Sequence, residues 1–285
     1  MTKINRLLRA HIKNVAIHHT IFDLPFAYVG AILASGGDPG WKVLIWITLA
    51  LTGARCAALA IDNLVDFKYD KVHPRFTKRP MVTGDLSKRD AVVFIAVCAV
   101  IMVYSAVQLP DICLKLLPVA AFPSVIYPFM KRITCLCHAV LGVAIAMAPA
   151  GGWIAAGGSI DWNLILLCSA VGLWIGSFDV IYGVQDIEFD ISQGLHSMAV
   201  SVGAVNAFRL AAIGHAMSIG TFIWLGIRMG LNYLYFIGIA VAACTLIYQH
   251  RIADYRDFSW LTQKYFMRNG IVSIAILIFT FTSFL

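Results

Sequence analysis

The chain has 285 residues, of which 60% are hydrophobic and only 13% are charged, and its formal net charge is +7. A soluble domain carries about 25% charged residues, so this composition excludes a soluble globular protein. It also excludes a disordered chain. Seven cysteines, an odd number that falls mostly within apolar runs, do not indicate a disulfide scaffold. The composition predicts a membrane protein that crosses the bilayer several times.

Nine apolar stretches are long enough to cross a hydrocarbon core, which takes about 17–25 residues each. They lie near residues 14–34, 41–62, 91–109, 112–130, 133–156, 162–182, 205–228, 231–249 and 269–285. The first is the weakest, because two histidines, Asp23 and Pro25 interrupt it. These runs are too long for strands, and a bilayer admits only helices or closed barrels. We therefore expect residues 1–285 to form one all-α domain, a bundle of about nine transmembrane helices.

Lysine and arginine are concentrated on one side of this expected topology. Of the 22 basic residues, 17 lie in the N-terminal segment and in the even-numbered loops. The positive-inside tendency places these segments in the cytoplasm and the C-terminus on the opposite side of a cell membrane of the bacterial inner-membrane type. The positive charge then faces the anionic lipid surface of the bilayer, and it requires no nucleic-acid partner.

Six aspartates form two short clusters, each at the end of an apolar span. They are Asp62, Asp66 and Asp70 after the second span, and Asp179, Asp186 and Asp190 after the sixth. On an α-helix, each set of three falls within about 40–80° of arc, so two stripes of carboxylates are expected. A solvated helix end is the simple alternative, but like charges at this spacing destabilise a helix. Because Mg²⁺ prefers carboxylate and phosphate oxygens, the stripes favour a site for Mg²⁺ and a diphosphate.

The loop after the first cluster is strongly basic. It reads KVHPRFTKRPMVTGD and contains Lys71, Arg75, Lys78 and Arg79. Arginine can bind phosphate through two parallel hydrogen bonds, and lysine adds a point charge. The positive-inside bias would by itself place several basic residues here. The spacing of Arg75 and Arg79 predicts that both face the site.

These motifs resemble the signatures of the UbiA-type intramembrane prenyltransferases. The first signature, NxxxDxxxD followed by a basic loop and RPxxxG, is similar to residues 62–70 followed by Arg79, Pro80 and Gly84. The second, DxxYxxxDxxxD, is similar to residues 179–190, and the segment 127–132 also looks like the family. The family usually has asparagine where this chain has Asp62, so either Asp62 or Asn63 is expected to take that place.

The resemblance implies a membrane enzyme that moves a polyprenyl group from a polyprenyl diphosphate to a ring carbon of a hydroxyaromatic acid, with Mg²⁺ as cofactor. It implies that all six aspartates hold the metal and that Asp66, Asp70, Asp186, Asp190, Tyr127 and Tyr182 act in catalysis. Diphosphate binding is implied for Arg75, Lys78, Arg79 and Lys131. The segments 131–134, 138–142 and 148–153 look like the subgroup that uses 4-hydroxybenzoate or dihydroxynaphthoates such as 1,4-dihydroxy-6-naphthoate, in ubiquinone or menaquinone biosynthesis.

Arg55 is the only arginine well inside an apolar span. It lies seven residues before Asp62, so it shares the acidic face of the helix at a deeper level. A buried arginine usually has a partner, which is either the carboxylate of an aromatic substrate or an acid of the protein itself. Asn63 is the second residue expected to bind the aromatic substrate.

Histidines near these spans have open roles. His19 and Asp23 are spaced to line the site from the first span. His138 and His215 are alone on apolar helices, so they are expected to be hydrogen-bonded core residues. His196 either closes its loop over the diphosphate or only caps that loop.

Two other classes of protein compete with the enzyme. A secondary transporter also carries charges within the membrane, but its site lies near the midplane, whereas these aspartates are expected at one membrane face. A scaffold without catalytic activity would leave the two acidic clusters unexplained.

Overall fold

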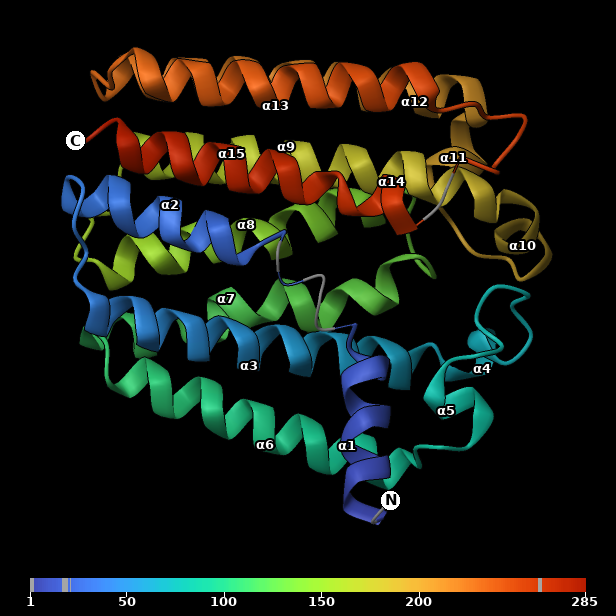
Figure 1. Cartoon of the computed structure of the whole chain (residues 1–285). Helices are drawn as coiled ribbons and strands as arrows, with labels where there is room; N and C mark the ends of the chain where they lie inside the picture. Colours follow the sequence, from blue (N-terminus) through green and yellow to red (C-terminus); the bar gives the residue numbers. More distant parts are fainter. Residues whose placement is uncertain (1–2, 17–19, 21, 261–262) are drawn as a thin grey trace.

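The computed structural model describes residues 3–16, 20, 22–260 and 263–285, and every regular element in that part is helical. Eight of the described helices are long and apolar enough to cross a membrane. They are α3 (Trp41–Val65), α6 (Lys88–Val107), α7 (Asp111–Met130), α8 (Cys137–Ala155), the helical run that starts with α9 (Trp162–Gly183) and continues to Ser192, α12 (Ala204–Arg228), α13 (Tyr233–Ile252) and the run from Lys264 to Thr282 that includes α15 (Asn269–Thr282). With the shorter α2 (Leu24–Ser35), they confirm the predicted all-α membrane bundle of about nine helices (Figure 1).

The first expected span, residues 14–34, is wrong in its bounds. Helix α1 (Lys3–Asn14) ends where this span should begin, and α2 starts only at Leu24, with Pro25 in its first turn. Proline lacks a backbone N–H and clashes with a preceding helical turn, so a helix through Pro25 is disfavoured. Helix α2 ends at Ser35, and the next residue, Gly36, has a φ of 71°, which suits glycine. Its 12 residues span about 18 Å, less than the hydrocarbon core.

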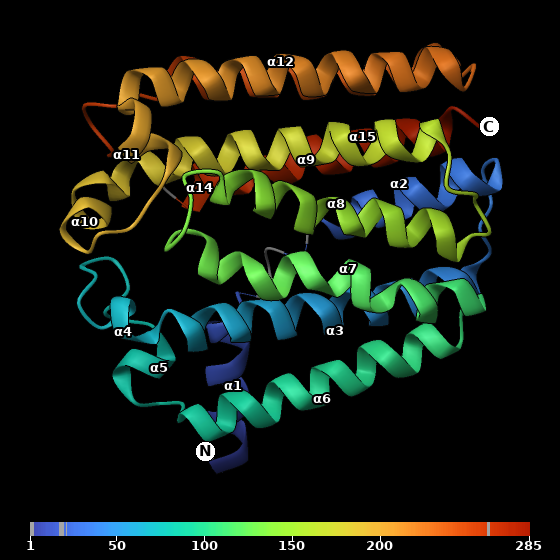
Figure 2. The ribbon, with the colours of Figure 1, turned by 180° about the vertical axis from the view of Figure 1, so that it is seen from behind.

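The short helices gather at one end of the bundle. They are α4 (Phe67–Asp70), α5 (Pro80–Thr83), the 3₁₀ helix η2 (Val184–Asp186), α10 (Ile187–Ser192), α11 (Met198–Val202) and α14 (Gln263–Met267). In Figure 1, α4 and α5 lie at the same end as α10 and α11, and the C-terminus lies at the opposite end. Seen from behind, α7 lies between α3 and α8 (Figure 2). Both aspartate clusters are therefore at a single end of the molecule.

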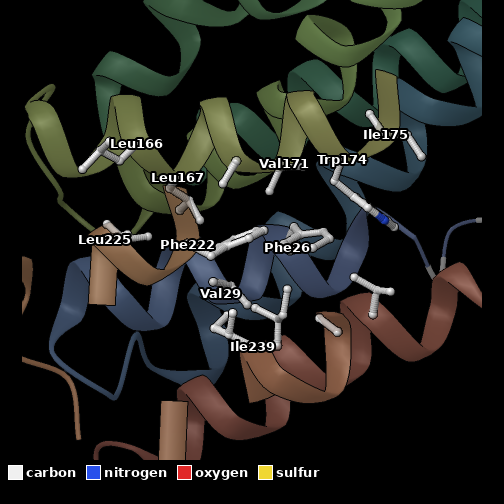
Figure 3. Packing of buried hydrophobic residues seen from close by; sticks show 14 of the residues in the cluster. Phe26, Val29, Leu166, Leu167, Val171, Trp174, Ile175, Phe222, Leu225 and Ile239 are labelled. Carbon is white, nitrogen blue, oxygen red and sulfur yellow. The ribbon is translucent and has the colours of Figure 1, made fainter. Parts of the chain in front are cut away.

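Close helix contacts hold the long helices in register. A Cβ atom at Gly152 of α8 would lie 1.8 Å from the carbonyl oxygen of Ala27 in α2, so only glycine permits this approach. Small residues at helix interfaces allow such contacts in membrane proteins, where packing rather than hydrophobic burial drives association. Figure 3 shows the core formed by α2, α9, α12 and α13. There the Phe26 ring lies 5.1 Å from that of Trp174 and 6.0 Å from that of Phe222.

Candidate active site

The first aspartate cluster straddles the end of a long helix. Helix α3 ends at Val65, and Asp66 follows with φ −86° and ψ 3°, outside the helical region. Helix α4 then carries the chain to Asp70. Aspartate is a poor helix former, and carboxylates spaced four residues apart repel each other, which explains the break.

The second cluster is interrupted in the same way. Asp179 lies in α9, but Asp186 belongs to the 3₁₀ helix η2 and Asp190 to α10. The expectation of one continuous helical stripe in each cluster is therefore wrong. Asp186 of the second cluster contacts His73 and Arg75 in the basic loop that follows the first cluster.

That loop joins the two clusters. Arg75 forms an ion pair with Asp186 of the second cluster, and its other terminal nitrogen donates to the Tyr182 hydroxyl at 3.0 Å. Arg79 pairs instead with Asp70 of the first cluster. Both arginines thus face the site, as their spacing predicted, although residues 72–79 form turns and the two arginines contact opposite clusters.

His73 strengthens the same junction. The Arg75 backbone N–H donates to its Nδ1 at 3.2 Å, which leaves Nε2 to carry a proton 3.3 Å from the Asp186 carboxylate. The His73 ring is buried and lies 4.1 Å from that of Phe189 in α10. Lys78, in contrast, is exposed and makes no ion pair within the described residues.

The turn after α7 supplies two more cations. The Lys131 ammonium lies 3.3 Å from the Asp190 carboxylate, and Arg132 donates to Asp66 at 2.8 Å. Neighbouring residues of one turn thus contact one aspartate from each cluster. Burial would lower the pKa of Lys131, but the carboxylates of Asp190, Asp186 and Asp179 outweigh burial and raise it.

The remaining carboxylates of the first cluster lie close to these cations. Asp62 makes no ion pair in the part of the chain that the structure describes, but the charges of Arg79 and Lys131 act on it. Burial raises the pKa of Asp66 and of Asp70, and the paired arginines only partly offset this effect. Buried carboxylates of this kind are most stable as anions when further positive charge is supplied.

The donor set fits a hard divalent cation. All six side chains are carboxylates, which are the ligands that Mg²⁺ takes together with phosphate oxygens. Among the described residues, no three acidic, histidine or cysteine side chains are gathered into one ligand cluster. Asp66, Asp70, Asp186 and Asp190 each contact a lysine or arginine instead. The site therefore alternates acidic and basic groups, and a metal diphosphate offers matching charges to both.

Both predicted tyrosines lie at this end of the bundle. The Tyr182 ring is 5.1 Å from the Arg75 guanidinium carbon and 5.3 Å from the Phe266 ring. Tyr127, in the last turn of α7, is within the electrostatic influence of Asp179, Asp62 and Asp66. Both rings therefore lie near the charged end of the bundle, and their catalytic roles stay predictions.

His138 is buried and hydrogen-bonded, as expected. Its partner is the carboxylate of Asp179, which lies 2.6 Å from its Nδ1, so His138 also belongs to the second cluster. His215 agrees with the prediction, because it is buried and bonds to His250 and to the Trp174 carbonyl. The His196 backbone N–H donates to the Lys131 carbonyl at 2.6 Å and so ties its loop to the Lys131 turn.

The two residues expected to bind the aromatic substrate have partners in the protein. Asn63 is buried, and its amide donates to the Asn14 carbonyl at 2.8 Å. This hydrogen bond holds the C-terminal end of α1 against α3. Of the two neighbouring residues, Asp62 is therefore the one that faces the charged site. Arg55 forms a buried ion pair with Asp23, just before α2. His19 lies outside the described residues.

Sequence reasoning missed three contributors to the site. Arg132 directly follows Lys131 in the sequence, and His73 lies within the basic loop of residues 71–85. His138 carries no local signal, because only the packing of α8 against α9 brings it to Asp179.

Comparison with known proteins agrees with this geometry. Residues 24–271 match the UbiA prenyltransferase family. A 4-hydroxybenzoate octaprenyltransferase of Vibrio campbellii is 28% identical over 247 residues, which cover 87% of this chain and 86% of the relative. A protein of the same name from Nitrosococcus oceani is 30% identical over 225 residues, covering 79% of each chain.

Solved structures show the same fold. The apo structure of a UbiA homolog from Aeropyrum pernix K1 superimposes with a TM-score of 0.84 at 33% identity and covers 94% of this chain and 99% of its own. A UbiA homolog from Archaeoglobus fulgidus bound to DMAPP and Mg²⁺ has a TM-score of 0.73 at 20% identity, covering 96% and 98%. The resemblance seen in the two aspartate motifs is confirmed, and the chain belongs to the UbiA prenyltransferase family.

Proposed function

We propose that this protein transfers a polyprenyl group from a polyprenyl diphosphate to a ring carbon of a hydroxyaromatic acid. The observation that carries the proposal is the alternation of carboxylates and cations at one end of the bundle, where Arg75 and Lys131 contact the second cluster and Arg79 and Arg132 the first. Support also comes from the names of its relatives, which are 4-hydroxybenzoate octaprenyltransferases. The pathway is then ubiquinone or menaquinone biosynthesis.

The aspartates are the residues that would hold Mg²⁺. Asp62, Asp66 and Asp70 would do so from one side and Asp179, Asp186 and Asp190 from the other. When bound, the ion supplies positive charge that stabilises a leaving diphosphate. A UbiA homolog from Archaeoglobus fulgidus is described with GPP and Mg²⁺, which supports this cofactor.

The basic side chains of the chain itself would bind the diphosphate. Arg75, Arg79 and Lys131 are each about 28–29% exposed, so each can turn from its aspartate partner to a phosphate oxygen. Such charge-assisted bonds in a site shielded from water stabilise the negative charge that develops as the allylic C–O bond breaks. Lys78 is exposed in the same loop and would approach the diphosphate only if the loop closed further.

The aromatic rings would stabilise the other product of that cleavage. An allylic carbocation is attracted to the face of a tyrosine ring, and Tyr182 is held at the junction of the clusters by its bond to Arg75. Tyr127 lies in the last turn of α7, where the charges of Asp179, Asp62 and Asp66 act on it. Arg55, deeper on α3, would bind the aromatic acid.

The membrane location suits these substrates. A long isoprenoid tail partitions into lipid at about 0.8 kcal/mol per buried CH₂. We propose that the N-terminus and the loops of the aspartate end face the cytoplasm, as the distribution of lysine and arginine indicates. A transporter site near the midplane does not fit, because both clusters lie at one end of the bundle (Figure 1).

The test is an assay of the purified protein in lipid nanodiscs with Mg²⁺, a polyprenyl diphosphate and a panel of hydroxyaromatic acids. We expect a C-prenylated product, identified by mass spectrometry, with 4-hydroxybenzoate or 1,4-dihydroxy-6-naphthoate. Product from neither class of acid would reject the proposed acceptor. Labelling of cysteines introduced into the loop 71–79 from either side of sealed vesicles would test the orientation.

A further inference from the structure

The outer face of α13 and α15 carries an open groove of about 520 Å³. Most of its lining is apolar and comes from α13, including Ile237, Ala240 and Val241, while Ile271 contributes from α15. The side chains of Ile237 and Ile271 are 42% and 50% exposed. The α13–α15 groove therefore opens outward, on a surface that faces lipid in a membrane-spanning bundle.

The groove has the length of one leaflet of a bilayer. It follows α13 from Ile237 to Tyr248, which are 11 residues apart in one helix. That separation corresponds to about 16 Å, about half of a hydrocarbon core of about 30 Å. A lipid acyl chain that lies along α13 would fill the groove over the depth of its own leaflet.

A cation lies at one end of the groove. Arg268 directly follows α14, and in Figure 1 α14 lies at the same end of the bundle as α10 and α11. The guanidinium carbon of Arg268 is 4.9 Å from the centre of the Tyr248 ring, which is half exposed. Tyrosine and arginine at the end of a membrane-spanning helix are typical of the level of the lipid headgroups.

The charge of Arg268 is not compensated by the protein. Within the part of the chain that the structure describes, its guanidinium forms no ion pair with a carboxylate. It is also the only charged side chain among the described residues that line the groove. The Thr245 hydroxyl donates to the Val241 carbonyl of its own helix at 2.9 Å. Arg268 therefore keeps N–H donors that suit a phosphate group.

The groove is separate from the candidate active site. Phe266, two residues before Arg268, faces the site, because its ring lies 5.3 Å from that of Tyr182. Arg268 instead contacts Tyr248 on the outer face of α13. A molecule in the groove would thus lie behind α14 and not among the aspartates.

A second outward groove, on α6, shows what the cation adds. It measures about 440 Å³ and is lined by Val100, Val103, Tyr104 and neighbouring small apolar residues, without a charged side chain among the described ones. Such a surface offers an acyl chain the same apolar contact but gives no preference for a headgroup. Only the α13–α15 groove combines an apolar channel with a cation at headgroup level.

We propose that the α13–α15 groove is a binding site for one anionic phospholipid, with an acyl chain along α13 and the phosphate at Arg268. Basic pockets between membrane helices bind anionic headgroups in this way, and each basic residue near the surface adds to the attraction. The inference concerns the embedding of the protein in its membrane and is independent of the proposed catalytic activity.

The test measures lipid binding to the full-length protein in detergent by native mass spectrometry. Palmitoyl-oleoyl phosphatidylglycerol and palmitoyl-oleoyl phosphatidylcholine share their acyl chains and differ in net charge. We expect the wild-type protein to bind the first phosphatidylglycerol about fivefold more tightly than phosphatidylcholine. Arg268→Gln should remove this preference, and Arg268→Lys, which keeps the charge, should retain most of it.

Two control variants isolate the groove. Arg89→Gln removes an exposed cation at the start of α6 and should keep the wild-type preference. Ala240→Trp fills the α13–α15 groove and should weaken binding of the first lipid of either kind, whereas Val103→Trp fills the α6 groove and should leave the preference for phosphatidylglycerol unchanged.

Photocrosslinking locates the bound lipid. Phosphatidylglycerol with a diazirine in its acyl chain should label peptides that contain residues 237–248 or 271, and Arg268→Gln should reduce this labelling. Equal affinity of the wild-type protein for the two lipids, a preference that persists in Arg268→Gln, or labelling only elsewhere would each overturn the inference. Displacement of the label by an equal concentration of a polyprenyl diphosphate would also overturn it, because the groove would then hold the prenyl substrate.

Discussion

Arg75 follows the first aspartate cluster in the sequence, but its guanidinium group pairs with Asp186 of the second cluster. The residues are 111 positions apart, and the contact joins the loop after α4 to the 3₁₀ helix η2. A basic side chain of one motif thus neutralises a carboxylate of the other. This relationship makes the two motifs a single site, and most of the predictions below depend on it.

The variant Arg75→Ala should weaken use of the prenyl diphosphate more than use of the aromatic acid. A charge-assisted hydrogen bond contributes roughly 1.5–3 kcal/mol, so the KM for the diphosphate should rise about 10–150-fold. Arg79→Ala should act in the same direction. Separate titrations of the two substrates measure the effect.

Arg89→Ala is the matched control, because Arg89 is exposed at the start of α6, away from the ion pairs of the site. It should leave both KM values unchanged. A change confined to the aromatic acid in Arg75→Ala would contradict the role in diphosphate binding.

Replacement of Asp190 by asparagine should remove the carboxylate while keeping the size of the side chain. Asp190 is 1% exposed and lies beside Lys131, so the loss leaves a cation without its partner and a metal ion with one ligand fewer. We expect kcat/KM to fall on the order of 100-fold or more and the Mg²⁺ concentration for half-maximal rate to rise. The control variant Asp111→Asn should keep the wild-type kcat/KM and Mg²⁺ requirement. Wild-type kinetics in Asp190→Asn would contradict a role of Asp190 in the site.

Two substitutions of Tyr182 distinguish the role of its aromatic ring from the role of its hydroxyl group. Tyr182→Phe loses only the hydrogen bond from Arg75 and should reduce turnover about 2–10-fold, in line with about 0.5–1.5 kcal/mol for such a bond. Tyr182→Ala also loses the ring face that would stabilise the carbocation, so its kcat should fall further. Equal kcat values for the two variants would show that the ring face has no catalytic role.

The contact between α2 and α8 predicts a stability difference between adjacent glycines. Gly152→Ala would place a Cβ atom 1.8 Å from the Ala27 carbonyl oxygen and should cost about 1–3 kcal/mol of stability. Gly151→Ala has no atom within 4 Å of the new Cβ and is the matched control. Thermal unfolding in the same detergent should show a lower midpoint for Gly152→Ala only, and equal midpoints would contradict the packing described.

The long apolar helices and the two aspartate motifs could be predicted from the sequence, because hydrophobic length and residue spacing are local properties. The break at Pro25 was visible as an interruption, but its consequence, a separate α1 and a short α2, depends on how the chain packs over α3. The pairing of Arg75 with Asp186 could not be predicted, since turns rather than a helix carry the loop across the site. The contacts of His138 with Asp179 and of Asp23 with Arg55 could not be predicted from local spacing, because each joins segments that are far apart in the sequence.

The most direct test of the central claim is the stoichiometry of the reaction catalysed by the purified wild-type protein. With Mg²⁺, a polyprenyl diphosphate and the hydroxyaromatic acid, we predict that one diphosphate is released for each C-prenylated ring formed, and that EDTA abolishes both products. Near-normal formation of prenylated product in EDTA would contradict the metal-dependent mechanism. Release of diphosphate without any prenylated aromatic product would contradict the proposed transfer itself.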